Sequence, residues 1–125
     1  EQKIYFWDWT EISDPGIRFE NMVACQLLKY CHYHQDISGY KMELRYLRDT
    51  DGREVDFVVL KDKRPIFAVE AKLGERSFSS HLQYFKSRTS IPHFYQVHME
   101  SKDVEHRDFG RLVPFHKFCE ITEMP

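Results

Sequence analysis

Three charged residues interrupt two segments that otherwise have the composition of β-strands. Asp56 lies in the middle of residues 53–60, and Glu70 and Lys72 lie at the end of residues 65–72. Successive side chains of a strand point to opposite faces, so Glu70 and Lys72 share a face. Burying such groups beside apolar residues is costly unless they pair with each other or bind a metal. Two neighbouring strands that each carry a carboxylate therefore indicate a site for a divalent cation.

The chemistry that this set could perform is hydrolysis of a phosphodiester. That reaction needs an activated water, a cation on the phosphate oxygens and help for the leaving alkoxide. We expect Asp56 and Glu70 to bind Mg²⁺ or Mn²⁺, with the carbonyl of Ala71, waters and Glu20 completing the coordination. Lys72 would hold the attacking water or offset developing charge. The alternative is structural: Lys72 neutralises the two carboxylates as a partly buried ion network.

Glu20 would join this set from a helix. Asp14 is a good N-cap with Pro15 at the first helical position, and apolar residues then recur at helical spacing to about residue 34. Glu20 shares a side with Ala24 and Leu27, which brings it to the edge of the packed face. The competing interpretation is a surface or ion-pairing glutamate.

The remaining pattern predicts a mixed α/β (α+β) domain with a central sheet flanked by helices. Residues 49–52 and 61–64 have the composition of turns, which makes three consecutive antiparallel strands. A helix then crosses to a further strand, and the segment at 100–110 is expected to be a loop. The expected elements are a short strand at 3–7, a helix from 15 to 34, strands at 42–48, 53–60 and 65–72, a helix at 77–90, a strand at 94–99, and a closing strand or short helix at 112–121.

Length and composition indicate one domain over residues 1–125. No apolar segment approaches the roughly 20 residues that cross a bilayer, so no membrane partner is expected. Three cysteines, an odd number without a CxxC pair, favour reduced thiols and a cytoplasmic location. Because the chain begins with Glu1 rather than Met, we expect it to be a fragment of a longer protein. Neither the oligomeric state nor the biological pathway follows from the sequence.

The formal charge of −2 does not indicate a strongly basic nucleic-acid-binding domain, so a phosphate-binding surface must be local. Gln83 and Tyr84 could touch a substrate, but an exposed glutamine beside a packing tyrosine is the preferred interpretation. A zinc site at Cys31, His32 and His34 would need a distant fourth ligand such as Cys119 and lacks the usual spacing. The cations near the carboxylates that could contact phosphates are Arg18, Arg45, Arg48, Arg53, Lys72, Arg76, Lys86 and Arg88.

Taken together, these motifs resemble the PD-(D/E)XK nuclease superfamily. The ordered set is Glu20 on the first helix, Asp56 on one core strand and Glu70-x-Lys72 on the next. The superfamily's proline is replaced by Val55. More closely, residues 18–21, 51–57 and 69–72 resemble the domain of unknown function at the C-terminal end of many prokaryotic AAA+ ATPases. The resemblance covers most of the chain, and the ordered set is more specific than a lone Glu-x-Lys.

The resemblance implies a restriction-endonuclease-like core and a metal-dependent nuclease-like domain that acts on or binds DNA, with RNA not excluded. It also implies an AAA+ ATPase domain in cis upstream of Glu1, where ATP would bind, because this chain has no Walker A glycine loop. The alternative is a catalytically inactive module that binds DNA or protein and regulates the ATPase. Whether the domain is an enzyme stays open at this point.

Overall fold

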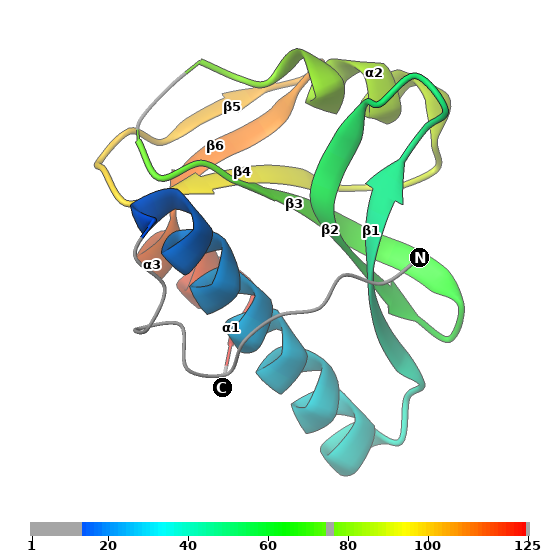
Figure 1. Cartoon of the computed structure of the whole chain (residues 1–125). Helices are drawn as coiled ribbons and strands as arrows, with labels where there is room; N and C mark the ends of the chain where they lie inside the picture. The colour runs from blue at the N-terminus through cyan, green and yellow to red at the C-terminus, as the bar shows by residue number, and fades with distance from the viewer. Residues whose placement is uncertain (1–13, 75–76, 125) are drawn as a thin grey trace.

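A computed structural model describes residues 14–74 and 77–124, and these form a six-stranded mixed sheet with three helices (Figure 1). The strand order in the sheet is β1-β2-β3-β4-β6-β5. The elements are α1 (Pro15–Ser38), β1 (Met42–Arg48), β2 (Glu54–Lys61), β3 (Arg64–Ala71), α2 (Ser80–Arg88), β4 (Phe94–His98), β5 (Val104–His106), β6 (Gly110–Pro114) and α3 (Phe115–Ile121). The expected fold class, a mixed sheet flanked by helices, is confirmed.

Strand direction changes in the middle of the sheet. β1, β2 and β3 are antiparallel neighbours, as their hairpin turns predict. β4 pairs in parallel with β3 and β6, and β5 pairs antiparallel to β6 at the edge. The crossover that makes β3 and β4 parallel contains α2, the connection that a parallel pair requires.

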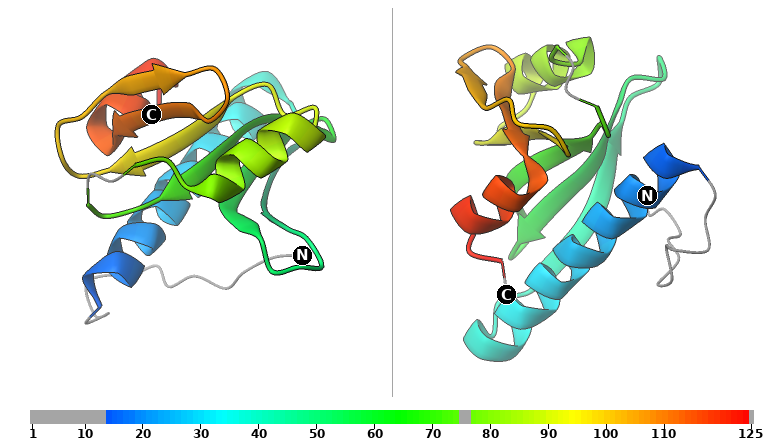
Figure 2. Two further views of the ribbon diagram at one scale, coloured as in Figure 1. Left: turned by 90° about the horizontal axis from the view of Figure 1, so that it is seen from above. Right: turned by 90° about the vertical axis from the view of Figure 1, so that its left-hand side faces the viewer.

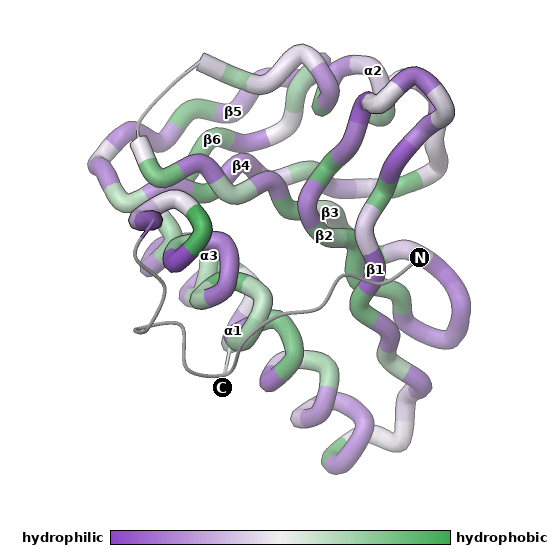
Figure 3. The backbone as a smooth tube through the Cα atoms, in the orientation of Figure 1, coloured by the Kyte–Doolittle hydropathy of each residue, from purple (hydrophilic) through white to green (hydrophobic). Residues whose placement is uncertain are grey.

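The helices lie on both faces of the sheet. Figures 1 and 2 show α2 on one face and α1 with α3 on the other. Side chains of alternate strand residues fill the two cores: Phe57 and Val69 pack with α1 and α3, whereas Val58 and Ala68 pack with α2. Figure 3 shows the corresponding alternation of hydrophobic and hydrophilic residues along α1. Because successive side chains of a strand point to opposite faces, the position of a residue in its strand decides which helix its side chain faces.

α1 begins as the sequence predicts and ends later. The Asp14 carboxylate accepts a hydrogen bond from the Ile17 amide at 3.0 Å, and Pro15 opens the helix. The helix continues one turn past residue 34 because no proline or glycine stands before Gly39. Gly39 ends it with a left-handed φ of 72°, and its amide donates to the Gln35 carbonyl.

The C-terminal third differs most from the expectation. Residues 100–110 are not all loop, because Val104–His106 forms β5 and pairs with β6. The apolar segment after it contains both alternatives, since Pro114 ends β6 and α3 follows directly. The expected helix at 77–90 is shorter, since the Ser79 hydroxyl caps α2 by accepting from the His81 amide.

Some expectations fall on residues outside the described part of the chain. These are the strand at 3–7 and the phosphate-contact candidate Arg76. Among the helices of residues 14–74 and 77–124, none has the combination of length and hydrophobicity that crossing a bilayer requires.

Candidate functional site

Asp56 and Glu70 lie together where the pairing of β2 and β3 stops. The ladder runs from Lys61 opposite Arg64 to Phe57 opposite Val69. Beyond it, side chains bridge the strands: the Asp56 amide donates to Glu70 Oε1 at 3.1 Å, and the Ala71 amide donates to Asp56 Oδ2 at 2.9 Å. The two carboxylates therefore occupy the space where main-chain hydrogen bonds would continue.

Both carboxylates are buried, with relative exposures of 8% for Asp56 and 6% for Glu70. Burial raises the pKa of Glu70, because a charged carboxylate loses hydration there. The positive charge of Lys72, the hydrogen bond from the Asp56 amide and the interaction with His81 act in the opposite direction on this pKa, and burial outweighs them. Glu70 is thus held in an environment that does not favour its negative charge.

Lys72 lies directly after β3, at the border between the carboxylates and solvent. Its Nζ atom is 3.5 Å from Glu70 Oε2, and 45% of its side chain is exposed. Its amide donates to the Val97 carbonyl at 3.0 Å, which extends the pairing of β3 with β4 by one bond. The backbone of Lys72 is therefore held by β4, while its ammonium can reach both Glu70 and solvent.

The structure places the expected ligands on different elements. Glu20 is a partly buried residue of α1, which packs on the face that Phe57 and Val69 share, whereas Glu70 follows Ala68 on the α2 face. Within residues 14–74 and 77–124, no three His, Cys, Asp or Glu side chains are grouped to hold a metal ion. Asp56, Glu70 and Lys72 come together, and the role of Glu20 as a ligand stays a prediction. Ala71 contributes its amide to Asp56, and its carbonyl as a ligand also stays a prediction.

Two positioning residues were not expected from the sequence. Gln96 is buried directly opposite Glu70; its amide oxygen accepts from the Ser79 amide at 2.8 Å and its nitrogen donates to the Ser77 carbonyl at 3.2 Å. His81, in the first turn of α2, has Nδ1 3.1 Å from the Glu54 carbonyl oxygen. Together they tie the start of α2 to the strands beside the carboxylates. A polar residue inside an apolar strand was a usable signal for Gln96, whereas nothing marked His81.

Tyr84 on α2 is a packing residue. Two guanidinium groups contact its ring, with the Arg53 and Arg88 Cζ atoms 4.0 Å and 4.1 Å from the ring centre. Arg53 also pairs with Asp49 at 2.9 Å and with Asp51 at 3.2 Å. Its charge is therefore compensated locally, which weakens it as a phosphate contact.

The chain matches a known protein family. Searches of curated proteins and of solved structures find nothing similar to this chain. Residues 15–118, which include α1, the whole sheet and both carboxylates, match the domain of unknown function DUF4143. The expectation of a domain of unknown function is confirmed. With this match over most of its length, the chain belongs to the DUF4143 family.

Proposed function

We propose that this domain is a metal-dependent phosphodiesterase of the nuclease type that acts on DNA. The observation that carries the proposal is the pair of buried carboxylates, Asp56 and Glu70, which bridge two neighbouring strands beside Lys72. The resemblance of the ordered Asp, Glu and Lys to the PD-(D/E)XK superfamily supports the same reaction class. It also supports attachment in cis to an AAA+ ATPase, which would bind ATP.

The donor set fits Mg²⁺ or Mn²⁺. Both cations prefer oxygen ligands, and Mg²⁺ is typically held by one or two carboxylates while it keeps several waters. Two buried carboxylates face one ammonium, so a divalent cation would offset the remaining negative charge. When bound, such an ion would polarise a phosphate oxygen and lower the pKa of a bound water. Asp56 and Glu70 would hold it, with the Ala71 carbonyl and Glu20 as further candidates.

The protein's own groups then have distinct tasks. Glu70 is aligned by the Asp56 amide, so its second oxygen points to Lys72. The half-exposed ammonium of Lys72 can orient an attacking water or compensate charge on the phosphate. His81 and Gln96 act as positioning residues, because their contacts fix α2 beside the carboxylates.

A second candidate is an inactive module that binds DNA or protein and regulates the ATPase. It is favoured by the internal pairing of the carboxylates: both oxygens of Glu70 and Oδ2 of Asp56 already have partners in the protein. Such a network is complete without an ion. In this case the acidic residues would fix the spacing of β2 and β3 and perform no chemistry.

All three cysteines are free thiols, which supports the expected cytoplasmic location.

Calorimetric titration with Mn²⁺, followed by a cleavage assay on fluorescent duplex and single-stranded DNA, tests the proposal. Binding should be lost in Asp56→Asn and Glu70→Gln, whose amide oxygens can still accept the bridging hydrogen bonds. Asp36→Asn, an exposed carboxylate on α1, is the matched control and should bind as the wild type does. Lys72→Ala should keep metal binding and lose cleavage. Metal binding without cleavage would favour the inactive module, and absence of Mn²⁺ binding would refute the metal site.

A further inference from the structure

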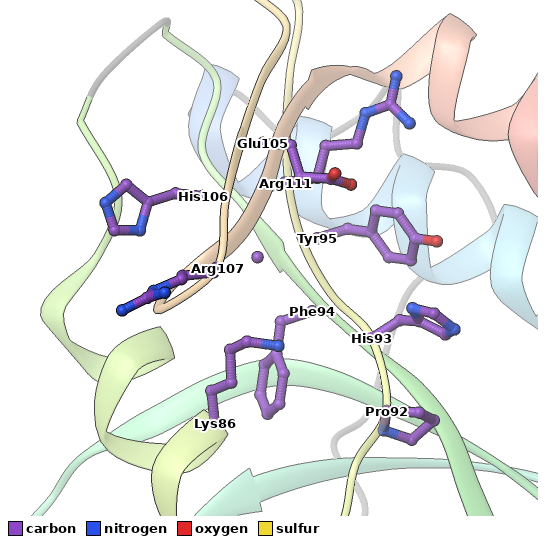
Figure 4. A pocket seen from close by; sticks show the side chains of 10 residues that line it. Lys86, Pro92, His93, Phe94, Tyr95, Glu105, His106, Arg107 and Arg111 are labelled. Carbon is purple, nitrogen blue, oxygen red and sulfur yellow. The ribbon is translucent and has the colours of Figure 1, made fainter.

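A hollow lies at the amino ends of the parallel strands β4 and β6. Its volume is about 360 Å³, within the range of about 300–1,000 Å³ that small-molecule sites occupy. It lies between the end of α2, the start of β4 and the turn that joins β5 to β6 (Figure 4). The lining residues that matter here are Lys86, Phe94, Tyr95, Glu105, Arg107 and Arg111. Lys86, which the sequence suggests as a phosphate contact near the carboxylates, lines this pocket.

The charges of this pocket are unequally compensated. Arg111 is held by Asp103 through two parallel hydrogen bonds of 2.9 Å, so its charge is already matched. Within the described part of the chain, neither Lys86 nor Arg107 has an ion-pair partner. Figure 4 shows these two side chains on one side of the pocket and the Glu105 carboxylate on the opposite side, close to Arg111. One side of the pocket therefore carries two positive charges in a chain whose formal charge is −2.

The turn that carries Arg107 is anchored by aromatic contacts. Phe109 stacks on Phe78 with ring centres 5.2 Å apart, and His106 meets Phe109 edge-on at 5.2 Å. A hydrogen bond of 3.2 Å from the Phe109 amide to the His106 carbonyl closes the turn. Arg107 is thus presented from a fixed turn, which lowers the entropy that a ligand must overcome.

The part of the pocket formed by β4 and β6 is closely packed. Gly110 begins β6 so close to β4 that a Cβ atom would lie 2.2 Å from the Phe94 carbonyl oxygen. The Lys86 ammonium lies 6.0 Å from the centre of the Phe94 ring. The rings of Tyr95 and His93, 6.4 Å apart and inclined by 31°, line the remainder. The pocket consequently combines two cations with the exposed ring of His93 and the partly exposed ring of Tyr95, whereas the Phe94 ring is buried in the core.

We propose that this pocket binds the phosphate group of a nucleotide, with Lys86 and Arg107 on the phosphate and the rings of Tyr95 and His93 beside the base. A guanidinium suits phosphate because it donates two parallel hydrogen bonds, and an ammonium adds a point charge. Nucleobases stack on aromatic side chains regardless of sequence. Glu105 on the opposite side disfavours a second phosphate there, so the ligand carries one phosphate end. That end belongs either to a free mononucleotide or to the phosphorylated terminus of a strand.

Fluorescence anisotropy with labelled pentathymidylate, with and without a 5′ phosphate, tests this proposal. EDTA is present throughout, so that the result is independent of metal binding at Asp56 and Glu70. The wild type should bind the phosphorylated probe about tenfold more tightly, since hydrogen bonds to charged groups contribute about this factor. The double variant Lys86→Gln, Arg107→Gln should lose this preference. The matched control is Lys63→Gln with Arg64→Gln, which removes one lysine and one arginine charge where the turn after β2 enters β3 and should keep the preference for the phosphorylated probe.

Competition assigns the source of the phosphate. Displacement of the probe by thymidine monophosphate at similar concentrations would identify a free nucleotide, and retention of the probe would identify a strand end. Inorganic phosphate should compete weakly, because it cannot use the aromatic rings. The Gly110 amide resonance should shift when either nucleotide ligand binds. The proposal would be overturned by equal affinity of the wild type for the two probes. It would also be overturned by an equal loss of the phosphate preference in the two double variants, or by nucleotide binding without a shift of the Gly110 amide resonance.

Discussion

Replacing Gly110 by alanine should destabilise the fold far more than the same change at other left-handed glycines. Gly110 has a φ of 105°, a region that residues with a Cβ rarely adopt. The added Cβ would also lie 2.2 Å from the Phe94 carbonyl oxygen and 2.9 Å from the Phe94 carbonyl carbon. These atoms belong to the backbone of β4 and cannot rotate away, so one of the two parallel strands must shift.

The expected size follows from these two contributions. Holding a non-glycine residue in a sparsely populated backbone region costs about 1–3 kcal/mol. Forcing an extra methyl group into a packed site costs about 1–3 kcal/mol more. The free energy of unfolding should therefore fall by about 2–6 kcal/mol, a large part of the ~5–15 kcal/mol that stabilises a typical domain. For a chain of this size, each kcal/mol lowers the melting temperature by about 4 °C, which gives about 8–24 °C in total.

Gly39→Ala is the matched control. Gly39 also has a positive φ, 72°, but a Cβ added there meets nothing within 4 Å. Only the left-handed backbone is then penalised, by about 1–2 kcal/mol. Urea denaturation monitored by circular dichroism, together with scanning calorimetry, measures both variants against the wild type. Equal losses of stability in the two variants would refute the close approach of β6 to β4.

Two further predictions concern titration and reactivity. Burial raises the native pKa of Glu70, so the native state binds this proton more tightly than the unfolded state. The free energy of unfolding should therefore fall as the pH rises from the unfolded pKa, about 4.5, through the native pKa. Glu70→Gln should abolish this decline, so its stability relative to the wild type should increase from pH 4 to pH 7 in urea denaturation. Burial also raises the pKa of the Cys31 thiol, to about 11, so iodoacetamide at pH 8 should modify native Cys31 more slowly than the less buried Cys119, as measured by mass spectrometry.

Both predictions have controls within the chain. Glu120→Gln removes one exposed carboxylate from α3 and should leave the pH dependence of stability as in the wild type. A Glu70→Gln advantage that grew as the pH fell would contradict the argument from burial. For the cysteines, urea should equalise the two alkylation rates, and equal rates in the native protein would contradict the burial of Cys31.

The sequence predicted the elements whose signals are local. Asp14 and Pro15 mark the start of α1, and the turns at residues 49–52 and 61–64 give the antiparallel strands β1 to β3. β5 escaped prediction because it has only three residues, Val104, Glu105 and His106, all exposed at the edge of the sheet, so no apolar alternation marks them. Its partner β6 supplies the pairing, and that pairing is not encoded in the segment itself.

The candidate site shows the same division. Mid-strand carboxylates are visible in the sequence. In the structure, each of the Asp56 and Glu70 carboxylates accepts a hydrogen bond from a backbone amide of the other strand. The position of Glu20 depends on how α1 is placed against the sheet, which spacing along one helix does not determine. The role of Gln96 depends on a crossover that sets β4 beside β3 in register, a long-range event without a local signature.

The bridging of β2 and β3 by Asp56 and Glu70 makes these side chains spacers as well as acids. The interval between the strands at this point is set by the reach of one aspartate and one glutamate, each anchored on the opposite backbone. A charge-conserving exchange such as Asp56→Glu would therefore alter the distance between β2 and β3 at this point, because it adds a methylene to one of the two bridging side chains. Side-chain length is thus constrained here independently of acidity, whether the residues bind an ion or only hold the strands apart.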